Sequence, residues 1–367
     1  MNNFSQVDLK DLLTVEQNQY LDTSISQVIS GLETNHQLYE ANSGSVSADS
    51  LAINWAKKYY SAVEAGKNQT LRIIQENPQS INVEENRAKI VDKLTDILKV
   101  ASEIAWGRVE ATFGQEIKYQ GIDPNLINPS EIIADTGKFY HKAIEAYADR
   151  EPIFRLSVLA GKDMIEMRRK YSQTDPLVLA FVALEFQYTN KILLGCLSES
   201  ERMQFAPYLK ILDDYLHIPY GEINLAAANL APNSKALLAV QHLLQHTSQI
   251  ANAVYDRASS HHQGYRSSSG YLTDAEVKTS GIRDIEIFQS YLCWCVLEGS
   301  LRPVQQELFP MCVMLYPKLH VSWELVQDML LIMFWEISDR LSAEDLMVFL
   351  PYLRTVTEMF SSDVFEN

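Results

Sequence analysis

Apolar and polar positions along the chain repeat mostly with the 3.6-residue period of an α-helix. The clearest example covers about 83–113, where apolar residues recur at spacings of one, three and four. Similar patterns, each opened by a capping residue and closed near a proline or glycine, recur from Thr14 to about Phe360. No stretch has the alternation of a convincing strand. The pattern predicts an all-α fold, either an irregular multi-helix bundle or a helical array, with two helical subdomains as one option.

Caps and breakers divide this pattern into separate helices. The stretch from Gly114 to Pro129 is rich in Gly, Pro, Asn and Asp and is expected to break the helix before it. The expected helices are Thr14–Tyr39, Ser50–Asn77, 83–113, Ser130–Ala148 and Pro152–Tyr171, then one after Pro176, one from Ser198, one from Pro207 to His217, one from Ser234 to Ser259, and further starts at Thr273, Ile282, Pro303, Ser322 and Ser342.

The most loop-like segment is the Ser- and His-rich stretch from Ser259 to Leu272. We place the expected boundary there, between a larger helical domain of residues 1–259 and a smaller, very apolar subdomain of residues 273–367. The alternative is that the two pack as one unit. No fixed-period repeat is visible, so a regular helical solenoid is not predicted.

The charge balance narrows the possible partners. The chain has 31 Lys and Arg against 47 Asp and Glu, a formal charge of −16. A surface this acidic repels phosphate backbones, so nucleic acid is not an expected partner. The N-terminus lacks the basic and apolar regions of a signal peptide, and the longest apolar run, Leu177–Leu184, is too short to span a membrane. We therefore expect a soluble, cytoplasmic protein with no transmembrane segment, whose four cysteines are buried free thiols.

Motifs for cofactor or nucleotide chemistry are missing. The sequence has no Gly-x-Gly-x-x-Gly, no phosphate-binding Gly-Lys-Ser/Thr loop, no His-Glu-x-x-His and no Gly-x-Ser-x-Gly. No cofactor is expected on this basis, and whether the protein is an enzyme stays open.

A few side chains are weak candidates for catalysis. His141 falls on the boundary between the polar and apolar faces of its predicted helix, beside Tyr140, as a residue at the rim of a pocket would. Glu185 is a carboxylate inside an otherwise apolar helix. Both arrangements are also typical of ordinary half-buried side chains in helical bundles.

The spacing of helical di-metal ligands, an acid three residues before a histidine, occurs at Glu33–His36 and Asp214–His217. A chain with eight histidines and 47 acids contains about one such pair by chance. His242 and His246, four apart, lie on the predicted wet face of their helix and lack a third ligand. No metal is therefore expected, and the weak candidates are Glu33, His36, Asp214 and His217.

The helix from Ser322 to Ile337 differs from the others because it is apolar almost all round. Such a helix either forms the centre of a domain or contributes to a subunit interface. A core role is the default interpretation. The interface alternative would use Met329, Met333, Phe334 and Trp335.

Two hypotheses of function follow. The first is a non-catalytic helical interaction protein, a scaffold, adaptor or assembly factor with a protein partner or a homo-oligomeric state. The alternative is a helical-bundle enzyme or carrier with a metal or apolar-ligand pocket near His141. The alternative predicts that Tyr140, His141, Glu185 and the Asp214–His217 pair converge in space.

Overall fold

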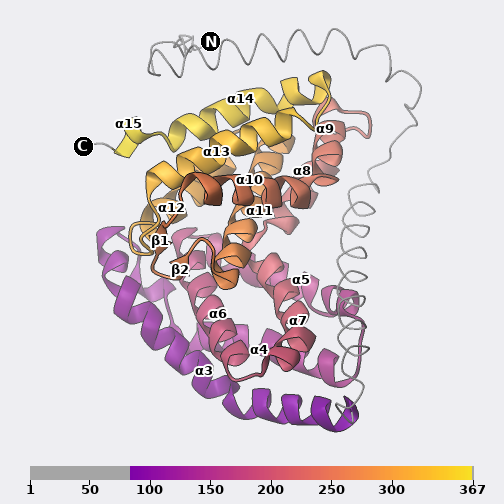
Figure 1. The fold of residues 1–367 in the computed structure, drawn as a ribbon, viewed down its shortest axis with the longest axis vertical. Helices are drawn as coiled ribbons and strands as arrows, with labels where there is room; N and C mark the ends of the chain where they lie inside the picture. The colour runs from indigo at the N-terminus through magenta and orange to yellow at the C-terminus, as the bar shows by residue number, and fades with distance from the viewer. Residues whose placement is uncertain (1–82, 366–367) are drawn as a thin grey trace. The chain divides into compact units, whose positions relative to one another are not determined.

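The computed structural model describes residues 83–365 (Figure 1). The helices expected at Thr14–Tyr39 and Ser50–Asn77, and the pair Glu33–His36, lie outside the described residues. Within residues 83–365 the fold is all-α apart from one two-stranded hairpin. This confirms the predicted fold class.

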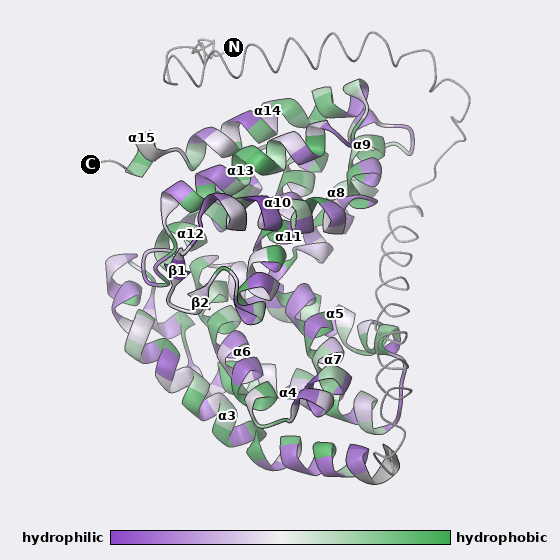
Figure 2. Cartoon of the chain, viewed as in Figure 1, coloured by the Kyte–Doolittle hydropathy of each residue, from purple (hydrophilic) through white to green (hydrophobic). Residues whose placement is uncertain are grey.

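The first group of helices surrounds one hydrophobic core of buried residues between Ile90 and Leu216, which Met314 also enters. Helix α3 packs along α4 and α6, and α5 packs against α4 and α7. Hydrophobic and hydrophilic residues both occur along the length of α3 (Figure 2), and Ile90, Leu94 and Phe113 are among its residues buried in this core. The elements are α3 (Val83–Tyr119), a 3₁₀ turn (Pro124–Leu126), α4 (Pro129–Ala148), α5 (Ile153–Ser172), α6 (Leu177–Gly195) and α7 (Glu199–His217).

A second core contains buried residues from Ile218 to Phe360. Here α10 packs between α11 and α13, while α14 contacts α9, α11 and α13. The elements are α8 (Tyr220–Ala228), α9 (Lys235–Leu244), α10 (Thr247–His261), β1 (Arg266–Ser267), β2 (Gly270–Tyr271), α11 (Ala275–Glu298), a π-helical turn (Val304–Leu308), α12 (Phe309–Leu315), α13 (Trp323–Ser338), α14 (Ala343–Met359) and α15 (Ser362–Phe365).

The two cores meet in sequence at His217–Ile218. The Ser259–Leu272 segment, where the sequence placed its boundary, lies inside the stretch that forms the second core and contains the β1–β2 hairpin. The division into residues 1–259 and 273–367 stays a prediction.

Capping signals predicted several helix starts correctly. Ser198 and Glu201 form the expected capping box, and Ser322 and Ser342 cap α13 and α14. Asn128, rather than Ser130, caps α4.

Breaker signals were less reliable. Helix α3 continues through Gly114 to Tyr119, and α7 runs straight through Pro207. In both places buried neighbours hold the chain helical, Phe113 in α3 and Phe205 and Tyr208 in α7, so tertiary packing outweighs the local propensity. Conversely, the single helix expected over 234–259 is two helices, α9 and α10, and the separate starts at Thr273 and Ile282 belong to one helix, α11.

Helix α6 alone among the described helices has the length and apolar composition that crossing a membrane requires. Its side chains Val178–Val182 are buried in the first core, and a central core helix passes the same test. Its apolar character is therefore explained by packing against α3, α5 and α7.

Candidate functional site

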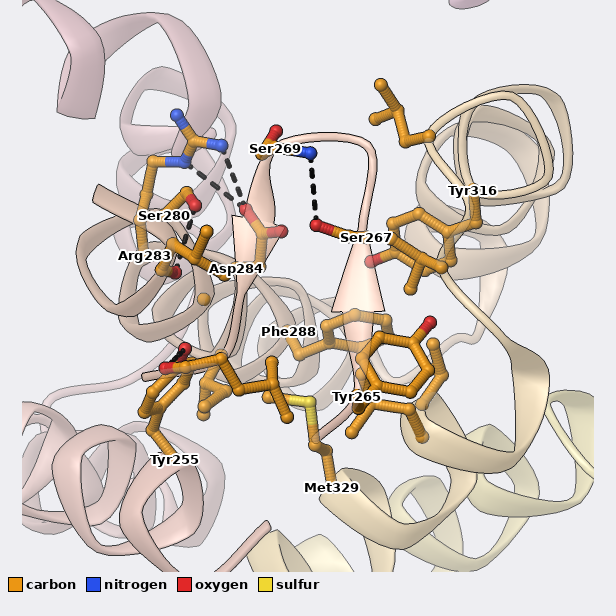
Figure 3. A pocket seen from close by; sticks show the side chains of 18 of the residues that line it. Tyr255, Tyr265, Ser267, Ser269, Ser280, Arg283, Asp284, Phe288, Tyr316 and Met329 are labelled. Carbon is orange, nitrogen blue, oxygen red and sulfur yellow. Dashed lines mark hydrogen bonds and ion pairs between the residues drawn. The ribbon is translucent and has the colours of Figure 1, made fainter. Parts of the chain in front are cut away.

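A cavity of about 130 Å³ lies within the second core, between the hairpin, α10, α11 and α13 (Figure 3). Most of its wall is apolar or aromatic, and one side is polar. Helix α11 supplies the polar side because Ser280, Arg283 and Asp284 lie within one turn of it. The apolar wall includes Leu272, Val277, Ile285, Phe288, Leu325, Val326, Met329, Leu330 and Met333.

The polar wall is a charged pair. Arg283 donates from Nε and Nη2 to Asp284 Oδ1, at 3.2 and 3.0 Å. From Nη1 it also donates to Asp213 Oδ2 of α7 at 3.4 Å. Burial would lower the pKa of Arg283, but the two carboxylates outweigh it and raise that pKa. The guanidinium therefore stays charged, and its donors already have partners on the protein.

The hairpin closes one side of the cavity and is tied to the turn before α13. The Tyr265 hydroxyl donates to the His320 carbonyl at 2.8 Å and accepts from the Ser322 amide at 2.7 Å. The Ser268 amide donates to the Leu319 carbonyl at 3.0 Å. Figure 3 shows the hairpin between the Arg283–Asp284 pair and Tyr316.

Gly281 sits at a close approach between α11 and α10, where a larger residue would not fit. A Cβ at this position would lie 2.2 Å from the Cε2 atom of Tyr255, which lines the same cavity. Tyr255 in turn donates to the Leu272 carbonyl at 2.8 Å and so connects α10 to the chain after the hairpin. The absence of a side chain at Gly281 therefore fixes this part of the cavity wall.

Asp213 and Asp214 are adjacent in sequence but have different partners. Asp213 lies between Arg283 and His217, whose Nδ1 is 2.9 Å from the Asp213 carbonyl. Asp214 accepts from Lys210 at 2.7 Å. Burial raises the pKa of Asp214 and lowers that of His217. Residues 83–365 contain no group of three potential metal ligands, so Asp214 and His217 have no third ligand among them.

Tyr140 and Glu185 both lie in the first core, whereas His141 is exposed on the other side of α4. Tyr140 donates to the Phe186 carbonyl at 2.8 Å and contacts Asn190 Oδ1 at 2.9 Å. Burial raises the pKa of Tyr140, and the negative charge of Glu185 raises it further. His141 is thus separated from the other two, and the predicted convergence of all these side chains is not observed. His141 does not line the cavity described above.

Glu185 is fully buried, and Thr189 donates to its Oε1 atom at 2.8 Å. Its Oε2 atom accepts no hydrogen bond of normal geometry among the described residues. Burial raises the pKa of Glu185 to about 7, although the nearby hydroxyls of Thr189, Thr136 and Ser102 oppose this. Because the site is buried and apolar, the neutral, protonated form of the Glu185 carboxyl is favoured there up to about neutral pH.

His242, His261 and His262 each contact a carboxylate. His242 Nδ1 lies 2.8 Å from Asp345 Oδ2 and links α9 to α14. His246 lies in the turn between α9 and α10, so it does not share a helix face with His242 as predicted. His261 Nδ1 and His262 Nε2 both contact Asp328 Oδ2, at 3.0 and 3.1 Å, and hold the end of α10 against α13.

The four interface candidates of α13 differ in burial. Met333 is 2% exposed and belongs to the second core, and Met329 borders the cavity. Phe334 and Trp335 are half-buried, with ring centroids 5.2 Å apart in an edge-to-face arrangement. Their role in an interface stays a prediction. The thiols of Cys293, Cys295 and Cys312 are buried as expected, but Cys196 is exposed because it caps the end of α6.

Sequence reasoning missed the residues that shape the cavity, namely Tyr255, Tyr265, Gly281, Arg283 and Asp284. The one available signal was the pairing of a glycine with an Arg-Asp dipeptide in an apolar helix. No known motif has this combination of residues, so the sequence does not predict that they lie next to Tyr255 and the hairpin. Only the tertiary structure shows this.

Residues 214–359 match the model of the phycobilisome protein family. The match covers less than half of the 367 residues, and it includes nearly all of the second core and every residue of the cavity wall except Gln187. No curated protein and no solved structure matches the chain. The similarity therefore concerns the half of the described structure that contains the cavity.

Proposed function

We propose that this protein is a non-catalytic, cytoplasmic assembly or adaptor protein that acts on phycobilisomes or their subunits. The observation that carries the proposal is the match of residues 214–359 to the phycobilisome protein family. Proteins of that family assemble into complexes with other proteins. In this proposal the second core associates with phycobilisome components, and the first core makes the protein different from a simple subunit.

Several buried or partly buried acidic side chains already have partners within the protein, which supports a role without catalysis. Asp213, Glu307 and Asp345 are each engaged by a cation or hydroxyl of the protein itself. Side chains held in this way contribute to the fold and have little freedom to act on a substrate. Half-buried aromatic residues on α13, such as Trp335, provide surface of the kind that protein interfaces use.

Co-sedimentation of the purified full-length protein with isolated phycobilisomes tests the proposal. We expect saturable binding that persists at moderate ionic strength, because apolar contacts would dominate it. Bovine serum albumin, also an acidic helical protein, provides the negative control. If the protein stays in the supernatant at all phycobilisome concentrations, the proposal is wrong.

The cavity favours a second candidate function, the binding of an apolar ligand. Its volume of about 130 Å³ is close to that of cavities that bind a benzene-sized molecule. Phycobilisome family proteins include bilin-binding proteins, which makes a bilin the first ligand to test. A bilin is several times larger than benzene, so the hairpin would have to move to admit it.

Titration of the full-length protein with biliverdin, followed by visible absorbance, tests this second function. We expect a saturable spectral change, and we expect Met329→Trp, which fills the cavity from α13, to reduce it. An equal response from wild type and Met329→Trp would show that any binding occurs elsewhere. No spectral change at all would exclude a bilin as the ligand.

A further inference from the structure

The β1–β2 hairpin forms a wall of the cavity that is one layer of chain thick. Ser267 and Ser269 line the cavity, and both are labelled on the hairpin in Figure 3. Ser269 is also exposed to solvent, as are Arg266 and Ser268 of the same hairpin. The hairpin therefore has the cavity on one side and solvent on the other, and its position decides whether the cavity is closed here.

The pairing within the hairpin is too short to fix that position. The ladder has two residue pairs, Arg266 with Tyr271 and Ser267 with Gly270. An isolated two-stranded hairpin is marginally stable at best in water. Gly264, directly before the hairpin, has a φ of +79°, which glycine adopts without steric cost. The hairpin therefore depends on its contacts with neighbouring elements.

Tyr265 makes the main contact between the hairpin and the turn before α13. Its hydroxyl donates to the His320 carbonyl at 2.8 Å and accepts from the Ser322 amide at 2.7 Å. The Ser268 amide adds a bond to the Leu319 carbonyl at 3.0 Å. His320 has a φ of +53°, a left-handed conformation that is uncommon outside glycine. All three bonds join neutral groups, and such bonds contribute little net stability, so this contact is a weak one.

The turn is the fixed side of this contact, because the first core holds it. Leu319 packs against the first core, and Lys318 Nζ lies 3.1 Å from Glu116 Oε1 of α3. At the other end of the hairpin, Leu272 is 9% exposed and belongs to the second core. The segment that can move without disturbing either core is therefore residues 265–271.

We propose that residues 265–271 form a lid over the cavity, which opens when Tyr265 leaves the turn while the surrounding helices stay in place. An open lid admits a small apolar molecule to the wall formed by α11 and α13. The proposal deepens the second candidate function and rests on it for what enters, because it supplies the route by which the ligand arrives. The movement itself requires no ligand.

Thiol labelling of a residue inside the cavity measures this opening without a ligand. Val326 lines the cavity and is 4% exposed, so Val326→Cys places a thiol there. Cys295 is 0% exposed, lies in the second core and is not part of the cavity wall, so it reports unfolding of that core. With methyl methanethiosulfonate, followed by mass spectrometry of peptides, we expect the introduced thiol to react faster than Cys295. Equal rates would mean that the cavity opens only when the core unfolds, which overturns the proposal.

Tyr265→Phe in the Val326→Cys protein tests the role of the hydroxyl. It removes two of the three bonds to the turn, so we expect the introduced thiol to react about tenfold faster, with Cys295 unchanged. The matched control is Tyr271→Phe, which removes a hydroxyl from the other strand at a 46% exposed position and should change neither rate. An unchanged rate in Tyr265→Phe, or an equal rise at Cys295, overturns the proposal. If Tyr265→Phe fails to fold, the two thiols of the Val326→Cys protein decide.

The lid and the bilin hypothesis can fail separately. Labelling as expected without a spectral change in the biliverdin titration would support the lid and exclude a bilin as the ligand. A spectral change that Met329→Trp reduces, together with equal labelling of the two thiols, would support ligand binding in the cavity and overturn the lid.

Discussion

The guanidinium of Arg168 donates to the carboxylate of Glu307, so a residue of α5 in the first half of the structure is neutralised by the π-helical turn of the second half. Arg168 is 1% exposed. It also donates to the hydroxyl of Tyr291 at 2.9 Å, and a second nitrogen contacts Glu222 at 3.3 Å. Arg168 of the first core therefore contacts α8, α11 and the π-helical turn, which all belong to the second half of the structure. These contacts link the two cores.

Glu307→Gln is expected to destabilise the protein, because it leaves the buried Arg168 charge with Glu222 as its remaining acidic partner. Removing one member of a buried ion pair costs about 3 kcal/mol. Urea unfolding followed by circular dichroism measures the change. The control is Glu166→Gln, since Glu166 contacts Lys162 at 3.7 Å on the exposed side of the same α5 helix. That variant should change stability by less than about 0.5 kcal/mol. Equal effects of the two variants would contradict the proposed link between the cores.

Glu185 is expected to make stability depend on pH. Burial raises its pKa from 4.5 to about 7 in the folded protein. Above pH 4.5 the unfolded chain loses this proton first, so the folded state loses stability as the pH rises from about 4.5 to about 7, and the penalty is constant above that. The near-isosteric Glu185→Gln variant should therefore match wild type near pH 5 and exceed it by up to about 3 kcal/mol at pH 8.

Urea unfolding of both proteins at pH 5 and pH 8 measures this difference. Comparing the variant with wild type isolates Glu185 from other titrating groups, such as Asp214, whose pKa is raised by burial as well. A difference between the two proteins that is the same at both pH values would show that Glu185 has an ordinary pKa.

Gly281→Ala is expected to destabilise the second core and deform the cavity. The new methyl group would lie 2.2 Å from the Tyr255 ring, which must shift at a cost of about 1–3 kcal/mol. Gly107→Ala in α3 is the matched control, because a Cβ there meets no atom within 4 Å. Replacing glycine by alanine in an open helical position should stabilise by up to about 1 kcal/mol. Thermal unfolding would reveal the opposite signs, and stabilisation by both substitutions would contradict the close approach at Gly281.

Trp335→Ala and Met333→Ala should have different effects: the first should weaken binding to phycobilisomes, and the second should lower the stability of the fold. Trp335 is half-buried, and we expect its loss to weaken co-sedimentation with phycobilisomes by about tenfold, as for an interface residue of moderate importance. Met333 is 2% exposed, and its truncation should lower the free energy of unfolding by about 2–5 kcal/mol. Sedimentation and urea unfolding of both variants give the comparison. If Trp335→Ala binds like wild type, α13 is not the contact surface.

Local signals in the sequence were enough for part of this structure. Helical periodicity predicted the fold class, and serine caps predicted the starts of α7, α13 and α14, because a cap depends only on residues within one turn. Glycine and proline misled at Gly114 and Pro207, since the buried side chains around them keep those segments helical. Helical spacing by itself does not say which apolar residues of α3 are buried: Ile104 is 46% exposed, because α4 and α6 cover the other side of the helix.

The candidate site could not be predicted from the sequence, and the reason is physical. By itself, the sequence determined that the protein is helical and acidic and has enough apolar residues for large cores, because these properties follow from composition and short-range spacing. Only the tertiary structure decided that Gly281 faces Tyr255, that Arg283 joins Asp213 across 70 positions, and that Arg168 meets Glu307. Such contacts depend on how helices pack, and packing is selected by the sum of many weak apolar contacts, which no local pattern records.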